Sequence, residues 1–300
     1  EHHPELDEVL VWDRKRWKTL WKERRLLTLL REIRGFVQEL RKRRFDVAID
    51  LQGLLRSGLV TFLSGAPIRI GLGSREGSRI LMSRVLPRDE GDIRKISSEY
   101  RHAAETLGLD VGDFRMEVPL APEDEAWAGE TIREMGLEGG YLVAIPFTTR
   151  PQKHWFEDRW AQLMDRIAKE LTLPAVVLGG PGDEPALERI RGMAESEPVS
   201  LVGRTSLTQA GAIIQRASLV VGVDTGLSHM AIAFDRPTVT IFGSNIPYTD
   251  PPTDRAKVLV HWLECSPCKG NPTCNGDFTC LKLISVDQVL ETAREVLAMD

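Results

Sequence analysis

Alternation of short apolar segments with helical segments is the feature of this sequence that most restricts its fold. Residues 141–146, 175–178, 199–201, 219–223 and 237–242 are rich in Val, Ile, Leu and Ala, and helical patterns fill the stretches between them. Repeated strand–helix units form a parallel sheet with helices on both faces. The sequence therefore predicts a doubly wound α/β domain in the second half of the chain.

The first half has the same α/β character but opens differently. It predicts a strand at 8–12, a basic helix at 22–44, a buried strand at 45–51 and another short strand at 68–72. A doubly wound domain would have one more strand and helix before these elements. Glycines at positions 136, 139 and 140 mark the boundary. We therefore predict an incomplete N-terminal domain over residues 1–138 and a second domain over residues 139–300.

Charge is distributed unevenly along the chain. The net charge is −5, yet the segment 14–44 contains thirteen Lys and Arg against three Glu, which gives +10 there and −15 elsewhere. Such asymmetry indicates an anionic partner, such as an acidic substrate or a membrane surface, or else a solvated helix face. The acidity of the remainder argues against nucleic acid. No apolar run could span a bilayer, and the acidic start is unlike a signal peptide, which predicts a cytoplasmic protein.

The turn after the predicted strand at 219–223 concentrates polar groups. Asp224, Thr225 and Gly226 follow the strand directly, and His229 lies about one helical turn further on. Ligands of α/β proteins bind at the carboxyl ends of strands, where helix N-termini and free N–H groups point outward. Two interpretations stay open, because an Asp or Thr here could also cap the following helix. Capping does not require His229.

Three other strand ends in the second half suit a nucleotide. Residues 147–155 carry two threonines with Arg150 and Lys153, a good set for an anion. Residues 179–184 combine glycines, which allow close backbone approach, with carboxylates that could accept hydrogen bonds from a ribose. Residues 203–205 add Gly-Arg-Thr. Together these turns predict a nucleoside diphosphate site, although the chain contains neither a Gly-rich dinucleotide fingerprint nor a P-loop motif.

Short motifs spread along nearly the whole chain match those of one family. In the second half they are Val223-Asp224-Thr225-Gly226-Leu227-Ser228-His229, Asp235-Arg236-Pro237, Phe242-Gly243, Thr148-Thr149-Arg150 and Lys153-His154-Trp155. In the first half they are Asp50-Leu51-Gln52-Gly53-Leu54, followed by Arg56 and Ser57, and Arg16-Trp17-Lys18. This set resembles the lipopolysaccharide heptosyltransferases, glycosyltransferase family 9, and most of all their type I branch.

The resemblance implies a GT-B fold, in which two Rossmann-like domains face each other across a cleft and the last helix returns toward the first domain. It implies a glycosyltransferase that moves L-glycero-D-manno-heptose from ADP-heptose to Kdo of Kdo-lipid A, with inversion and without a metal cofactor. A peripheral protein at the cytoplasmic face of the bacterial inner membrane is expected. The alternatives are a family 9 transferase with another sugar or core position, or a catalytically dead relative that only binds nucleotide sugar or lipopolysaccharide.

The resemblance also assigns site residues. The nucleotide-sugar site would comprise Thr148, Thr149, Lys153, Asp183, Asp224, Thr225, Gly226 and His229, and the anionic acceptor would meet Lys15, Arg16, Lys18 and Arg75. Lys153 and Asp224 are the catalytic candidates, with Lys153 stabilising the departing ADP. The general base of the family is an Asp in a Gly-Asp turn that would lie upstream of residue 1, so no base is assigned. If the chain were complete, we would expect no transferase activity.

Four cysteines crowd into one segment of the second half. Cys265, Cys268, Cys274 and Cys280 lie within sixteen residues, and the first two have the C-x-x-C spacing of metal sites. This pattern is compatible with a structural zinc site that ties down a loop, with an iron–sulfur cluster, or with free or paired thiols. Such clustering is unlike the disulfide framework of a secreted protein.

Overall fold

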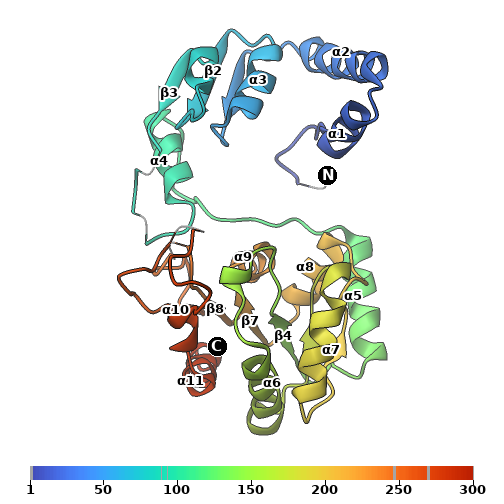
Figure 1. Cartoon of the computed structure of the whole chain (residues 1–300), viewed down its shortest axis with the longest axis vertical. Coiled ribbons are helices and arrows are strands. Elements are labelled where there is room, and N and C mark those ends of the chain that lie inside the picture. The colour runs from blue at the N-terminus through green and yellow to red at the C-terminus, as the bar shows by residue number, and fades with distance from the viewer. Residues whose placement is uncertain (1–2, 89, 93, 246–247, 269–270, 300) are drawn as a thin grey trace. The chain divides into compact units, whose positions relative to one another are not determined.

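The computed structural model describes residues 3–88, 90–92, 94–245, 248–268 and 271–299, and the chain forms two compact units (Figure 1). The first unit comprises residues 5–93 and 97–114, and the second consists mainly of residues 115–300. Helix α5 (Pro122–Glu134), which the sequence analysis places in the N-terminal domain, therefore lies in the second unit. It does so because its buried face packs into the core of that unit.

The first unit contains a three-stranded parallel sheet in the order β1 (Val47–Asp50), β2 (Ile68–Leu72) and β3 (Arg84–Leu86). Helix α3 (Leu55–Leu63), the 3-10 helix η1 (Ser78–Leu81) and helix α4 (Ser98–Thr106) accompany the sheet. A small core of Ile70, Leu72, Leu86 and Ala103 joins the sheet to α4. Strands are thus present at both predicted positions, 45–51 and 68–72, but the burial predicted for the first is wrong, because Asp50 is the one buried residue of β1.

The helix predicted at 22–44 is present over 26–42, and the basic segment forms a second helix before it that was not predicted. Helices α1 (Arg14–Lys22) and α2 (Leu26–Lys42) are separated by Arg24, whose φ of +58° reverses the chain without a glycine or proline. The strand predicted at 8–12 is also wrong, because these residues have irregular backbone. There Trp12 packs edge-on against Trp17, and both contact Phe36 of α2. Aromatic packing replaces strand pairing in this stretch.

The second unit contains a six-stranded, wholly parallel sheet in the order β6-β5-β4-β7-β8-β9. Its strands are β4 (Leu142–Ile145), β5 (Ala175–Val177), β6 (Val199–Ser200), β7 (Leu219–Val223), β8 (Thr238–Ile241) and β9 (Ala256–Leu259). The central strands are buried along their whole length, as their continuous apolar sequences require. The predicted parallel sheet is confirmed, while β9 extends it beyond the prediction.

Helices cover both faces of this sheet. One apolar core joins the sheet to α6 (Glu157–Leu171), α7 (Glu184–Met193) and α11 (Val286–Leu297). A second core joins it to α5, α8 (Leu207–Gln215) and α9 (Gly226–Ala233). Short helices η2 (Pro151–Lys153), η3 (Pro181–Asp183) and α10 (Thr279–Lys282) lie in the connections. The doubly wound organisation predicted for this half is therefore confirmed.

The strand order reverses between β4 and β7. The chain runs outward from β4 through β5 to β6, and then returns so that β7 pairs with the other side of β4. In open α/β sheets the connections diverge at such a point, and ligands bind beyond the strand ends. None of the described helices combines the length and the apolar character that a membrane crossing requires.

Candidate functional site

The site is built from two turns at the carboxyl ends of β4 and β7. These strands are neighbours, with Ile145 opposite Gly222, so the segments that follow them emerge side by side. Lys153 ends η2 after β4, and Asp224 follows β7 directly. The Lys153 ammonium Nζ lies 2.7 Å from Asp224 Oδ2, although 71 residues separate the two in sequence. The sheet thus joins two of the predicted site residues in one ion pair.

The loop that carries Lys153 is held at both ends. The His154 ring nitrogen Nε2 lies 2.7 Å from the carbonyl oxygen of Thr148, which closes the loop on itself. The next residue, Trp155, is buried and donates its indole N–H to the carbonyl of Ile284 at 3.1 Å. Because the backbone is anchored in this way, the ammonium group of Lys153 has a defined position over the end of β7.

Asp224 receives contacts from three directions. Besides Lys153, the Asn245 side-chain amide donates to Asp224 Oδ2 at 2.7 Å, and His229 Nε2 lies 3.8 Å from Oδ1. The Asp224 and Lys153 side chains are only 11% and 16% exposed. A mostly buried carboxylate is costly without charged or hydrogen-bonding partners. The cluster therefore holds one anion and one cation in a nearly dry position where a polar ligand could exchange partners with them.

His229 joins this cluster from α9 and stacks on Tyr248, with ring centroids 5.3 Å apart. Burial lowers the pKa of His229, the Asp224 carboxylate partly opposes this, and the Lys153 charge lowers the pKa further. A neutral imidazole is therefore favoured near pH 7. Its Nδ1 atom is buried without a hydrogen-bond partner among the described residues. Burial also raises the pKa of Tyr248, which keeps that phenol protonated.

The structure argues against a capping role for the Asp224 turn, and its role toward a ligand stays a prediction. Thr225 is the N-cap residue of α9, but its side chain makes no capping hydrogen bond, and the Asp224 carboxylate faces Lys153 and Asn245. Instead, Ser228 Oγ donates to the Val223 carbonyl at 2.7 Å and fixes the crossing from strand to helix. A Cβ atom on exposed Gly226 would meet nothing within 4 Å. The N-terminal N–H groups of α9 thus remain accessible to an anion.

The other predicted donor residues flank this cluster. Thr148 is half-buried and Thr149 is exposed in the loop after β4. Asp183 Oδ2 accepts a hydrogen bond from the backbone N–H of Gly180 at 2.7 Å, so its carboxylate stabilises its own turn after β5. Its role toward a ribose stays a prediction.

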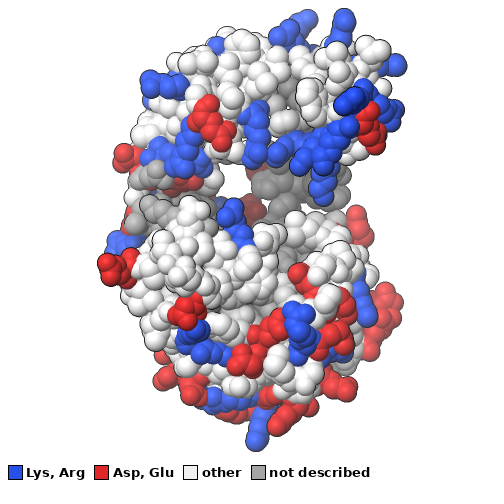
Figure 2. Space-filling view, in the orientation of Figure 1, with Lys and Arg blue, Asp and Glu red and all other residues white. Residues whose placement is uncertain are grey.

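The predicted acceptor residues all lie in the first unit and are exposed. Lys15, Arg16 and Lys18 belong to α1, and Arg75 lies in the turn before η1. Arg16 is held by Glu32 of α2, with its Nη2 atom 2.6 Å from a carboxylate oxygen. Figure 2 shows Lys and Arg gathered on the first unit, whereas both signs of charge are mixed over the second. The basic helices therefore present a cationic surface, as their sequence predicts.

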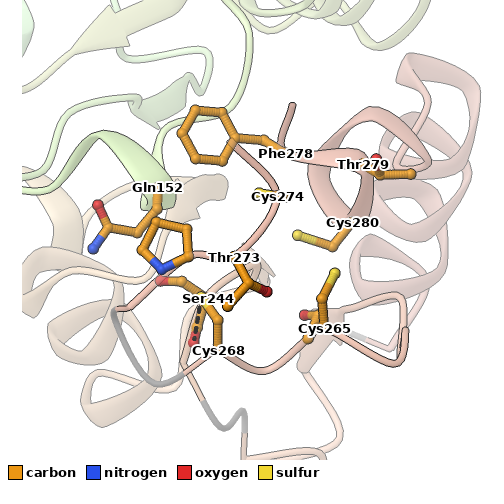
Figure 3. A pocket seen from close by; sticks show the side chains of 11 residues that line it. Gln152, Ser244, Cys265, Cys268, Thr273, Cys274, Phe278, Thr279 and Cys280 are labelled. Atoms are coloured by element: carbon orange, nitrogen blue, oxygen red, sulfur yellow. Dashed lines mark hydrogen bonds between the residues drawn. The ribbon is translucent and has the colours of Figure 1, made fainter. Parts of the chain in front are cut away.

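The four cysteines line one small cavity of about 10 Å³ together with Gln152 and Ser244 (Figure 3). All four thiols are free, and burial raises the pKa of Cys280. Among the residues that the structure describes, no group of three or more His, Cys, Asp or Glu side chains is arranged to hold a metal ion. The cysteine spacing therefore brings the thiols to one cavity, and the zinc site stays a prediction from that spacing.

Sequence reasoning missed two members of the site, Asn245 and Tyr248. Both follow β8, which pairs with β7, so Asn245 emerges at the same edge of the sheet as Asp224. Ligands of α/β proteins bind at the carboxyl ends of strands, and this rule applies to β8 as it does to β4 and β7. The available sequence signal was an Asn shortly after the strand end at Phe242-Gly243.

Known proteins share this architecture. Residues 33–278 match the model of glycosyltransferase family 9 (heptosyltransferase). Lipopolysaccharide heptosyltransferase 1 of Escherichia coli K12 is 27% identical, over 82% of this chain and 74% of that protein. A family 9 glycosyltransferase structure from Veillonella parvula superposes with a TM-score of 0.82 at 22% identity, covering 100% of this chain and 85% of that one. The E. coli ADP-heptose lipopolysaccharide heptosyltransferase II structure gives a TM-score of 0.68 at 25% identity, with coverages of 90% and 82%.

The family model spans most of the chain, and the structural neighbours have the same Rossmann-like α/β organisation. The predicted GT-B fold class and the assignment as a glycosyltransferase are both confirmed. This chain belongs to glycosyltransferase family 9, the heptosyltransferases.

Proposed function

We propose that this protein is an inverting heptosyltransferase that moves L-glycero-D-manno-heptose from ADP-heptose to Kdo of the lipopolysaccharide inner core. The observation that carries the proposal is the Lys153–Asp224 pair at the point where the strand order reverses, beside the open N-terminus of α9. A cation and free N–H groups suit a diphosphate, while a carboxylate and a neutral imidazole suit sugar hydroxyls.

In this proposal Lys153 stabilises the negative charge that develops on the departing ADP. Once Lys153 has turned from Asp224 to the diphosphate, its ammonium group and the N–H groups of α9 face the leaving group before the glycosidic bond breaks. A divalent metal serves this purpose in other transferases, and here the ammonium group supplies the positive charge. Asp224 and His229 orient the donor sugar. Thr148 and Thr149 bind the diphosphate from the loop after β4.

The acceptor proposal rests on the exposed cations of the first unit. Lys15 and Lys18 are exposed on α1, and their charge complements the phosphates and carboxylates of Kdo-lipid A. A lipid-linked acceptor also brings the protein to the cytoplasmic face of the inner membrane as a peripheral protein. Nucleic acid is not among the proposed partners.

A second candidate is transfer of heptose to a different core position. The structural likeness to heptosyltransferase II favours it, because that protein and heptosyltransferase 1 resemble this chain to a similar degree. The two candidates share a donor and differ only in the acceptor, so the donor site does not separate them.

Calorimetry and a turnover assay together test these proposals. We expect ADP-heptose and ADP to bind, and a UDP-sugar to bind at least tenfold more weakly; tighter binding of the UDP-sugar would refute the donor assignment. Kdo-lipid A and heptosyl-Kdo-lipid A are then offered as alternative acceptors, which distinguishes the two candidates. Turnover that persists in EDTA supports charge stabilisation by Lys153. Loss of turnover in EDTA would mean that the reaction requires a divalent metal instead.

A further inference from the structure

Two donors from different turns share one oxygen of Asp224. Lys153 Nζ and Asn245 Nδ2 both lie 2.7 Å from Oδ2, while His229 Nε2 lies 3.8 Å from Oδ1. A second contact brings Lys153 Nζ within 3.4 Å of the Asp224 carbonyl oxygen. The ammonium group is therefore paired with Asp224, and a diphosphate that binds Lys153 would compete with this carboxylate.

In such an exchange Asp224 would lose the Lys153 ammonium group, which is its main partner. A carboxylate that is 11% exposed cannot replace a lost ammonium contact with bulk water. Asn245 can keep its hydrogen bond to Asp224 during this exchange. Its amide is neutral, so a phosphate attracts it no more strongly than the carboxylate does. An amide also fixes the direction of its hydrogen bond better than an ammonium group does, because the charge of an ammonium group is nearly spherical.

The backbone beneath Asn245 is firmly held. Ser266 Oγ donates to the Gly243 carbonyl at 2.8 Å, and Cys268 Sγ donates to the Ser244 carbonyl at 3.7 Å. Gly243 packs so closely on Leu281 that an added Cβ would lie 2.8 Å from its side chain. The cysteine-bearing loop thus clamps the two residues before Asn245, which gives the amide a fixed base from which to reach Asp224.

We propose that Asn245 is a positioning residue of the donor site, which holds the Asp224 carboxylate in place while Lys153 turns to the diphosphate. The inference rests on the proposed function, because it takes a nucleoside diphosphate sugar as the ligand. It assigns the cysteine loop an indirect part in donor binding, through Gly243 and Ser244. Asn245 acts through Asp224 and not on the reacting atoms.

The test compares Asn245→Ala and Asn245→Asp with the matched control Asn271→Asp, which places the same new charge at an exposed position. Calorimetry with ADP-heptose and with ADP is run between pH 5 and pH 8. We expect Asn245→Ala to bind ADP-heptose about tenfold more weakly, and ADP less than threefold more weakly, because a loosened Asp224 affects the sugar more than the nucleotide.

Asn245→Asp provides a signature that a merely structural role would not produce. Two adjacent carboxyls raise the pKa of one of them, so the new Asp is protonated at low pH and can then donate as the amide did. Lys153, His229 and Tyr248 are the charged or titratable groups that face this pair. We expect ADP-heptose affinity to be at least tenfold weaker than wild type at pH 8 and to recover toward pH 5, unlike that of Asn245→Ala.

A stability measurement gives a readout without ligand. Because the pKa of the paired carboxyl in the folded Asn245→Asp variant exceeds its unfolded value, stability should be lost as pH rises through the folded pKa. We expect its melting temperature to fall by about 3 °C between pH 5 and pH 8, relative to Asn271→Asp. Wild-type affinities and a flat pH response in both Asn245 variants would overturn the inference alone. Failure of the wild type to bind ADP-heptose would overturn the proposed function, and this inference with it.

Discussion

Removing the Lys153 ammonium separates its contribution to folding from its contribution to ligand binding. In Lys153→Ala, the Asp224 carboxylate keeps Asn245 as a donor but loses its only close cation among the described residues. Truncating one partner of a fully buried pair costs about 3–5 kcal/mol, and leaving a buried polar group unsatisfied costs about 1–3 kcal/mol. Because both side chains keep some exposure and Asn245 remains, we expect a loss of about 2 kcal/mol.

The double variant Lys153→Ala/Asp224→Asn then removes both charges. It should recover most of the lost stability, since no uncompensated charge stays buried. Nucleotide affinity should behave differently: both variants should bind ADP at least tenfold more weakly than wild type, because neither has the cation. Urea unfolding and calorimetry measure the two quantities, with Lys169→Ala on the exposed side of α6 as the matched control. Wild-type ADP affinity in the double variant would refute the assignment of Lys153 to the diphosphate, and unchanged stability in Lys153→Ala would refute the energetic argument.

Three further predictions concern single positions. Gly226→Ala places a methyl group in open space at the first residue of α9, so stability should rise by up to about 0.5 kcal/mol while ADP affinity falls; equal affinity by calorimetry would show that no ligand approaches this backbone. The lowered pKa of His229 means that the unfolded state binds more protons between that pKa and the usual 6.5, so melting temperature should decrease as pH falls through this window; His229→Phe, which keeps the ring, should show a smaller decrease. Trp160 is fully buried and packs edge-on against Trp155, so Trp160→Ala should cost about 3–5 kcal/mol in urea unfolding, whereas Trp262→Ala, at a 58% exposed position, should change stability by less than about 1 kcal/mol.

The central strands of the second unit could be predicted from the sequence, because they are short, apolar and separated by helices. The strand predicted at 219–223 matches β7 at both ends, and the turn after it contains the ion-paired Asp224. The edge strand β9 was not predicted, because its apolar stretch is short and is interrupted by Lys257, and only Ala256 of its four residues is buried. The break between α1 and α2 was not predicted either, because an arginine such as Arg24 gives no sequence signal for a positive φ.

Lys153, Asp224 and His229 of the candidate site were named from the sequence, whereas Asn245, Tyr248 and the contacts among these residues were not. Sequence order shows that Lys153 and Asp224 each follow a strand, but pairing them requires knowing that β7 docks beside β4 and not beside β6. The partnership of Asn245 with Asp224 depends on the same strand order. For the cysteines, spacing predicted a possible zinc site. The four thiols line one cavity, but the direction of each thiol depends on loop packing that spacing does not encode, so the zinc site stays a prediction.

The reversal of strand order between β4 and β7 has a consequence for how the chain acquires ligand affinity as it folds. The segment from β4 to β6 can assemble from neighbouring stretches of sequence, whereas pairing of β7 with β4 closes a loop of more than seventy residues. Long-range pairing of this kind is slow relative to local contacts. The Lys153–Asp224 contact forms only at that step, so nucleotide binding during refolding would report the docking of the two halves of one sheet.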